Sequence, residues 1–154
     1  KSVGSGYEKL QFRNVQLEGG QGEANKPQEP IQTQKTAKTE FNLQTCKKSG
    51  DSVSCYFIVK NEGEDAVLEL KPYKSRIIDS EGNEYWGTTG KLASQEGKHP
   101  GSRLIYDMPV KARLDFARIP IKGSSIPLLE FVFNVKSVGS GYEKLQFRNV
   151  QLEY

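Results

Sequence analysis

The amino-acid sequence predicts an all-β fold, an antiparallel β-sandwich that carries a strand arm at its N-terminus. From residue 41 onward, short runs of alternating apolar and polar residues are separated by turn residues, and no run shows a 3.6-residue apolar period with helix caps. Several short strands spaced in this way are typical of a sandwich. The second observation is a repeat, because the first eighteen residues, KSVGSGYEKLQFRNVQLE, recur unchanged at 136–153. The sequence therefore predicts one β domain whose last strand is present twice.

Composition sets limits on the partners. Charged residues make up 27% of the 154 residues, the net charge is +3, and no run of five like charges occurs. A nucleic-acid partner is therefore not expected. No apolar stretch approaches the roughly 18 to 20 residues that span a bilayer, so no membrane span is expected. No signal peptide is recognisable, although a secreted chain would look the same after cleavage.

The sequence predicts three segments. Residues 1–18 form an arm that duplicates the last turn and strand, residues 19–40 form a flexible polar linker, and residues 41–154 form the β-sandwich. The linker is rich in Gly, Gln, Pro and Lys, has no aromatic residue and contains only Ala24, Ile31 and Ala37 as apolar residues. Such a segment does not bury enough apolar surface to offset its ordering entropy.

The first two strands of the predicted domain form a hairpin. Residues 41–46 and 53–59 alternate with period two, and Gly50 and Asp51 suit a two-residue turn. Counting outward from this turn places Cys46 opposite Cys55 at a non-hydrogen-bonded pair, which is within reach of a disulfide. Two free buried thiols are the alternative, but we expect the disulfide. A disulfide in turn favours an oxidising compartment, such as a bacterial cell surface or periplasm.

The remaining strands are shorter and are expected at 66–70, 75–79, 84–86, 103–107, 110–119, 128–135 and 144–152. In the last of them, Leu145 and Phe147 point one way, but the next apolar pair, Val150 and Leu152, is out of phase by one residue. A β-bulge at Arg148 and Asn149 would turn all four side chains to the core. Burial of four large apolar side chains is worth several kcal/mol, at ~1.5 to 3 kcal/mol each.

The N-terminal copy carries the same four side chains, as Leu10, Phe12, Val15 and Leu17. Two identical strands then compete for one position in the domain, within one chain or between chains. An exposed copy would tend to complete the sheet of another subunit, giving domain-swapped oligomers or donor-strand fibres. We therefore expect a non-enzymatic assembly module whose partner is a second copy of itself.

The perfect identity of the two copies has two explanations. Old repeats accumulate substitutions, and none is present here. Either the chain comes from a tandem array of near-identical units with a period of 135 residues, or the segment was duplicated by engineering. The junction Gly19-Gly20-Gln21-Gly22 favours engineering. A constructed conformational switch, or a self-complemented subunit, is thus an alternative to natural strand exchange.

The order of motifs from about 41 to 152 resembles the immunoglobulin-like domains of uncharacterised bacterial secreted or cell-envelope proteins. It runs FNLQTCKKSGDSVSCYFIVKNEGED, IIDSEGNEYW, MPVKARLDFARIP and a closing hairpin that ends in FRNVQL. The resemblance implies an immunoglobulin-like sandwich, a location outside the cytoplasm, and a role in adhesion, anchoring or assembly. The residues that fit the pattern are Cys46, Cys55, Asn61, Asp79, Gly82, Tyr85, Pro109 and Phe116.

Few residues suggest a chemical site. Tyr73, Tyr85 and Trp86 suit an aromatic platform for a glycan or envelope polymer, although the only tryptophan of a small sandwich is more often part of its core. Residues 79–84 hold several oxygen ligands but lack the closing glutamate of a calcium loop, so we expect a plain turn. No serine or cysteine stands next to His99 in the sequence. We expect no enzymatic activity, no metal and no cofactor.

Overall fold

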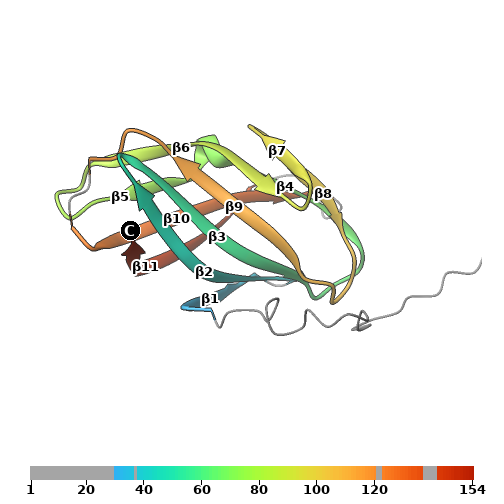
Figure 1. The fold of residues 1–154 in the computed structure, drawn as a ribbon. Helices are drawn as coiled ribbons and strands as arrows, with labels where there is room; N and C mark the ends of the chain where they lie inside the picture. Colours follow the sequence, from blue (N-terminus) through green and yellow to red (C-terminus); the bar gives the residue numbers. More distant parts are fainter. Residues whose placement is uncertain (1–29, 37, 121–122, 137–141) are drawn as a thin grey trace, which may run out of the picture.

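The computed structural model describes residues 30–36, 38–120, 123–136 and 142–154. These residues form β-strands and one 3-10 turn, so the prediction of an all-β fold is confirmed (Figure 1). The part of the chain that is described holds no helix of the length and apolarity needed to cross a membrane. In chain order the elements are β1 Gln32–Lys35, β2 Thr39–Ser49, β3 Ser52–Asn61, β4 Ala66–Leu70, η1 Pro72–Lys74, β5 Arg76–Ile78, β6 Glu84–Leu92, β7 Gln95–Gly97, β8 Gly101–Leu104, β9 Val110–Phe116, β10 Ser125–Val135 and β11 Glu143–Glu153.

Seven of these strands close into a ring, in the order β2, β3, β9, β6, β5, β10 and β11, after which β11 returns to β2. Every pairing in the ring is antiparallel except the last, where β11 runs parallel to β2. β6 and β11 make the closure because each changes its partner along its length. Strands β1, β4, β7 and β8 extend the ring outward. The immunoglobulin-like sandwich is therefore not confirmed, since the strands form a closed barrel with additional strands.

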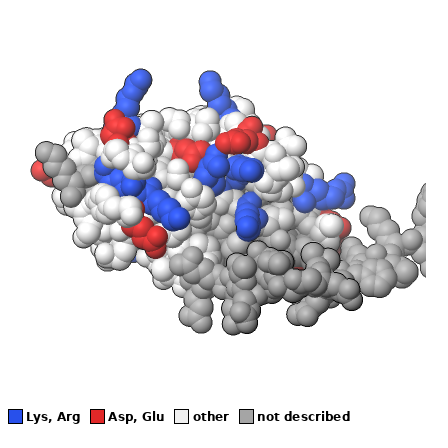
Figure 2. All heavy atoms as spheres, in the orientation of Figure 1, with Lys and Arg blue, Asp and Glu red and all other residues white. Residues whose placement is uncertain are grey.

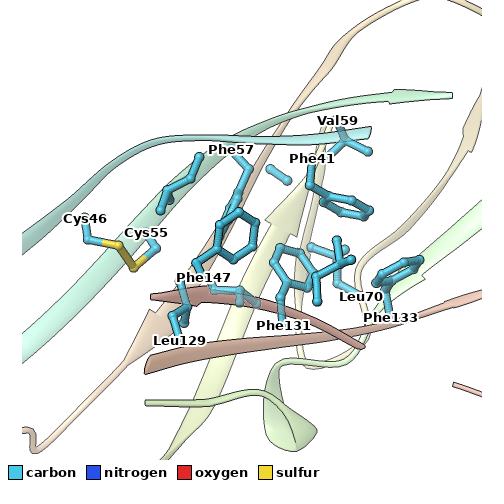
Figure 3. Packing of buried hydrophobic residues seen from close by; sticks show 14 of the residues in the cluster. Phe41, Cys46, Cys55, Phe57, Val59, Leu70, Leu129, Phe131, Phe133 and Phe147 are labelled. Atoms are coloured by element: carbon cyan, nitrogen blue, oxygen red, sulfur yellow. A yellow bond between two sulfur atoms is a disulfide. The ribbon is translucent and has the colours of Figure 1, made fainter. Parts of the chain in front are cut away.

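The β2–β3 hairpin has the register that the sequence predicts. Ser49 faces Ser52 across the turn, and Cys46 faces Cys55. These cysteines form a disulfide with their Cα atoms 4.0 Å apart, so the predicted disulfide is confirmed. A ring this short contributes about 2 to 3 kcal/mol by restricting the unfolded chain. Figure 3 shows the disulfide beside the aromatic part of the core.

Phenylalanine rings from four strands form the centre of the core (Figure 3). Phe41 packs against Phe131 and Phe133, with ring centroids 4.9 and 4.6 Å apart. Phe57 connects this group to β11, because its ring lies 4.7 Å from Phe131 and 5.6 Å from Phe147. Each of these side chains is almost fully buried. The last strand is therefore part of the main core.

Part of the predicted linker is a strand. Gln32–Lys35 forms β1 and pairs antiparallel with β2, from Gln32 opposite Leu43 to Lys35 opposite Glu40. The prediction of a flexible linker over 19–40 is wrong for these residues, because it considers only apolar burial. β1 is instead held by backbone pairing to the edge of β2, a contribution that does not depend on apolar side chains.

Candidate functional site

The last strand fills a position between β10 and β2. β11 pairs with β10 over all but its last two residues, from Glu143 opposite Phe133 to Gln151 opposite Ser125. Its contact with β2 is much shorter, because only Leu152 and Glu153 pair there, opposite Cys46 and Lys47. One edge of β11 is thus paired over most of its length, whereas the other closes the barrel through two residue pairs. We call this position of β11 the terminal-strand slot.

The four apolar side chains of β11 all reach the core. Leu145 and Leu152 are 7% and 8% exposed, and Phe147 and Val150 are fully buried. They belong to the same cluster as the phenylalanine rings of β2, β3 and β10. The slot therefore selects a strand with apolar side chains at these four positions.

The phase change within β11 differs from the predicted β-bulge. Ile126 faces Val150 and Leu128 faces Arg148, so β10 and β11 keep the same pairing offset on both sides of Asn149. Asn149 adopts a left-handed conformation with φ of 53°. The buried positions of β10 shift at the same level, since Ile126 and Leu129 are both buried. The prediction of an extra residue in one strand is wrong, because both strands change phase together.

Strand β1 contacts β11 through the side chain of one residue, Gln32. The amide of Gln32 donates from Nε2 to the carbonyl oxygen of Arg148, and its Oε1 accepts a hydrogen bond of 3.3 Å from the Arg148 backbone N–H. One side-chain amide thus takes the place of a neighbouring strand's peptide group. No strong sequence signal indicates this role, because Gln32 lies in a polar stretch that resembles a linker.

The N-terminal copy lies outside the described residues. This holds for Leu10, Phe12, Val15 and Leu17, the four residues predicted to take part in strand exchange. Their role stays a prediction that rests on sequence identity with β11.

The three aromatic residues predicted to form a platform are divided between two surfaces. Tyr73 and Trp86 are exposed, at 40% and 49%, and line one shallow pocket together with Tyr142. Tyr85 follows the alternation of β6 and turns away from Trp86, so that it packs partly against the core. Its hydroxyl donates a 3.1 Å hydrogen bond to Asp79. The platform therefore contains Tyr142 in place of Tyr85, a difference that depends on the fold and not on proximity in sequence.

The register of four strands places one row of side chains across this surface. Trp86 of β6 faces Arg76 of β5, which faces Glu130 of β10, which faces Gln146 of β11. A second position on the same face pairs Val132 with Lys144. We call the surface pocket lined by Tyr73, Lys74, Arg76, Trp86, Glu130, Val132, Tyr142 and Lys144 the aromatic face.

Glu130 provides the buried polar floor of the aromatic face. The residue is 4% exposed, and its carboxylate accepts a 2.8 Å hydrogen bond from Arg76 Nε and a 3.2 Å hydrogen bond from Gln146 Nε2. Burial raises the pKa of Glu130, but these hydrogen bonds outweigh it, and the pKa lies below its ordinary value. Arg76 also pairs with Glu84, 3.1 Å away, and hydrogen bonds to Glu84 and Glu130 raise the pKa of Arg76. Arg76 and Glu130 therefore form an ion pair in which each charge is balanced by the other.

Two lysines lie beside the aromatic rings. Lys74 Nζ is 4.8 Å from the ring centroid of Tyr142 and 5.5 Å from that of Tyr73. Lys71 lies 5.8 Å from the same Tyr142 ring, but it also forms a 2.6 Å ion pair with Glu69. Within the described residues, no carboxylate lies at ion-pair distance from Lys74 or from Lys144, the second lysine of the aromatic face. In these contacts Lys74 therefore meets only aromatic rings, and Lys144 acts on Glu130 through charge at a longer distance than that of an ion pair.

The 3-10 turn η1 sets the position of Tyr73. It lies directly on β6, where Gly87 donates a 2.9 Å hydrogen bond to the carbonyl oxygen of Ser75. A Cβ at Gly87 would approach the Pro72 carbonyl oxygen to 2.4 Å, so only glycine permits this contact. The proline and the glycine together hold the turn flat against the sheet. The sequence alone does not indicate this pairing.

The acidic turn after β5 is organised around Asp79. Its Oδ1 accepts backbone hydrogen bonds from Glu81 and Asn83, each 2.9 Å long, and its Oδ2 accepts from Asn83 Nδ2 and the Tyr85 hydroxyl. These are the contacts of an Asp-led turn. The structure shows no cluster of three metal-ligating side chains among the described residues. His99 contacts the ring of Tyr73, with centroids 5.0 Å apart.

Charges elsewhere on the surface are mixed in sign. Figure 2 shows Lys and Arg side chains interleaved with Asp and Glu on the viewed face. Among the ion pairs of the barrel, one group joins Arg113 to Asp115 and Glu96, and Asp115 also accepts hydrogen bonds from Ser54 and Thr89. Positive and negative side chains therefore alternate on this surface and form ion pairs with one another.

Comparison with known proteins gives only a partial likeness. No family model matches the chain, and no curated protein matches it. Solved structures with some similarity include the YjhA protein of Bacillus subtilis, 15% identical, with a TM-score of 0.45 over 70% of this chain and 81% of that one. They also include self-complemented MyfA, the major subunit of Myf fimbriae from Yersinia enterocolitica, 13% identical, with a TM-score of 0.44 over 75% of this chain and 98% of that one. The same subunit in complex with galactose gives a TM-score of 0.43 at 13% identity over the same shares. At these values the likenesses carry no argument about function.

Proposed function

We propose that this chain is a non-enzymatic extracellular assembly module that associates with copies of itself by exchanging its terminal strand. One observation carries the proposal. The slot between β10 and β2 is filled by residues 143–153, and the chain contains a second, identical copy of that strand at residues 8–18. Identical strands make identical contacts in the slot. The contacts alone therefore give no preference for one copy over the other.

Within one chain, the two copies of the strand differ in the length of the loop that must close before each can fill the slot. Thirteen residues separate Glu18 from Gln32, where β1 is anchored beside β11. As a random coil they would reach roughly 20 Å, enough to return the first copy to its own slot. Closing this longer loop instead of the short connection before β11 costs only about 0.5 kcal/mol more. Exchange within a chain and exchange between chains are thus both accessible.

The location outside the cytoplasm is part of the same proposal. The Cys46–Cys55 disulfide favours an oxidising compartment, as on a bacterial surface or in a periplasm. We also retain an immunoglobulin-like origin for the domain. The feature that supports it is that β6 and β11 each change partners, as strands do when they pass between two facing sheets.

Solution mass tests the proposal. The full chain should form dimers or larger species whose proportion rises with protein concentration, whereas a chain that lacks residues 1–18 should stay monomeric. The double substitution Leu10→Asp and Phe12→Asp is the matched control, because it keeps the length of the arm and removes its apolar side chains. Light scattering at several concentrations measures the result. Equal masses for the full chain and both variants would overturn strand exchange between chains through the first copy.

A second candidate is a binding module for an envelope polymer or glycan. The observation that favours it is the aromatic face, where Tyr73, Trp86 and Tyr142 line one pocket of a single sheet. Exposed aromatic rings in one pocket offer apolar surfaces that suit the apolar faces of sugar rings. Assembly and binding are compatible, because they use different faces of β11.

A further inference from the structure

We infer that the aromatic face binds an acidic polysaccharide, a chain of sugar rings that carry carboxylates. This inference rests on the second candidate function and names its ligand class. The face combines exposed aromatic rings with two lysines, Lys74 and Lys144, that form no ion pair with a carboxylate among the described residues. Lys144 is near enough to Glu130 to lower the pKa of that carboxyl, but the two do not form an ion pair. A neutral glycan gains ring contacts and hydrogen bonds on this face, whereas only an anionic glycan also gains charge pairing with the lysines.

The spacing of the face favours an elongated ligand. Trp86 lies on β6 and Lys144 on β11, with β5 and β10 between them. Three steps between neighbouring strands span about 14 Å. One sugar ring does not reach across this width, whereas a short chain of rings can contact Trp86 at one end and Tyr142 at the other.

Charge on the face is arranged in two parts. Arg76 is already paired with Glu130 and Glu84 and lies 5.7 Å from the ring centroid of Trp86, so it belongs to the floor of the face and its charge is balanced there. Lys74 and Lys144 border the tyrosine end instead, and each is a compact charge on a flexible stem. Carboxylates spaced along a polymer can pair with these lysines while the sugar rings lie against the aromatic side chains.

The repeat preserves this site during strand exchange. Tyr142, Lys144 and Gln146 belong to the duplicated segment, and the first copy carries the same residue types at the equivalent positions, as Tyr7, Lys9 and Gln11. Whichever copy fills the slot would supply the same side chains to the aromatic face. Variants that test binding should therefore be placed outside the repeat, at Trp86 and Lys74.

The test uses the full chain with two matched probes, an oligomer of polygalacturonate and the same oligomer with its carboxylates methyl-esterified. Calorimetry should show binding of the acidic oligomer that weakens as salt rises, and at least tenfold weaker binding of the ester. Trp86→Ala should weaken binding of the acidic oligomer by about tenfold. Lys74→Ala should remove most of the preference for the acid over the ester. Tyr56→Ala is the control, because Tyr56 of β3 is an exposed ring with Lys47 5.9 Å away and lies outside the aromatic face.

Each failure has a distinct meaning. If both oligomers bind equally and Lys74→Ala changes nothing, the acidic ligand class is overturned while glycan binding stands. If neither oligomer binds, or if Trp86→Ala has no more effect than Tyr56→Ala, the binding function is overturned as well. Tighter binding of an oligothymidylate than of polygalacturonate would identify a nucleic-acid site and would overturn the inference. Unfolding curves of each variant establish that it remains folded.

Discussion

Glu130 is a nearly buried carboxylate that stays charged, because Arg76 and Gln146 hold its two oxygens. Its pKa is lower in the folded protein than in the unfolded chain, where a glutamate has a pKa of about 4.3. The folded state therefore gains stability from this group above the unfolded pKa. That gain is lost as the pH falls through the folded pKa.

Replacement of Glu130 by Gln should reduce the acid sensitivity of the fold. At pH 7 the variant should be less stable by about 1 to 3 kcal/mol, because Arg76 loses a charged partner. Between about pH 6 and pH 3 it should lose less stability than the unaltered chain. Urea unfolding at both pH values measures the difference. Equal losses in the two proteins would show that Glu130 does not contribute to the acid dependence.

Asn149 is the residue at which β11 changes phase, and its φ of 53° lies in the left-handed region. Asparagine tolerates this conformation, glycine adopts it freely and β-branched residues do not. Asn149→Gly should therefore leave stability nearly unchanged, whereas Asn149→Val should cost about 1 to 2 kcal/mol. Chemical denaturation checks both. A valine variant as stable as the glycine variant would contradict the left-handed assignment.

At the scale of elements, the hairpin is the part that sequence predicts best. Its register depends on Gly50 and Asp51 at the turn and on alternation close to it, so the predicted pairing of Cys46 with Cys55 is confirmed. The patterns do not predict β1 and β7, because both strands are short and polar and are held by backbone pairing to a neighbour. Local residue patterns predict local pairing, whereas an added edge strand depends on a surface that exists only after folding.

The terminal strand offers an element-scale test within the full chain. Phe147→Ala should cost about 3 to 5 kcal/mol if β11 alone can fill the slot. If residues 8–18 can replace it, the loss should fall to about 0.5 kcal/mol, the cost of the longer loop. The double variant Phe12→Ala and Phe147→Ala should then restore the full loss. Phe12→Ala alone is the control and should be close to the unaltered chain.

The stabilities of the same variants also include the result that would contradict strand exchange. A Phe147→Ala chain as unstable as the double variant would show that the first copy does not enter the slot. Thermal and urea unfolding should agree on the ranking, because all four proteins have the same length.

At the scale of the whole molecule, closure of the barrel is beyond what sequence patterns can predict. It depends on two residue pairs between β11 and β2, which lie far apart in the chain. The aromatic face has the same origin. Tyr73 and Trp86 are recognisable as candidates in the sequence, but only the strand register brings Tyr142 beside them and turns Tyr85 away. The four buried side chains of β11 are identifiable because their pattern is local, although the bulge inferred from that pattern is wrong.

A cysteine trap for the occupant of the slot tests the central claim most directly. Leu128 of β10 lies opposite Arg148 of β11, and Arg13 is the equivalent of Arg148 in the first copy. In the variant Arg13→Cys and Leu128→Cys, a disulfide forms only when the first copy occupies the slot. The variant Leu128→Cys and Arg148→Cys, in which β11 supplies the partner, shows that the geometry permits the bond.

Peptide mapping and non-reducing denaturing electrophoresis after mild oxidation measure the outcome. Strand exchange predicts a disulfide between the two introduced cysteines of the Arg13→Cys and Leu128→Cys variant, with covalent multimers that increase with protein concentration when the exchange is between chains. Free thiols at both introduced positions, under conditions where the control variant is fully cross-linked, would contradict it.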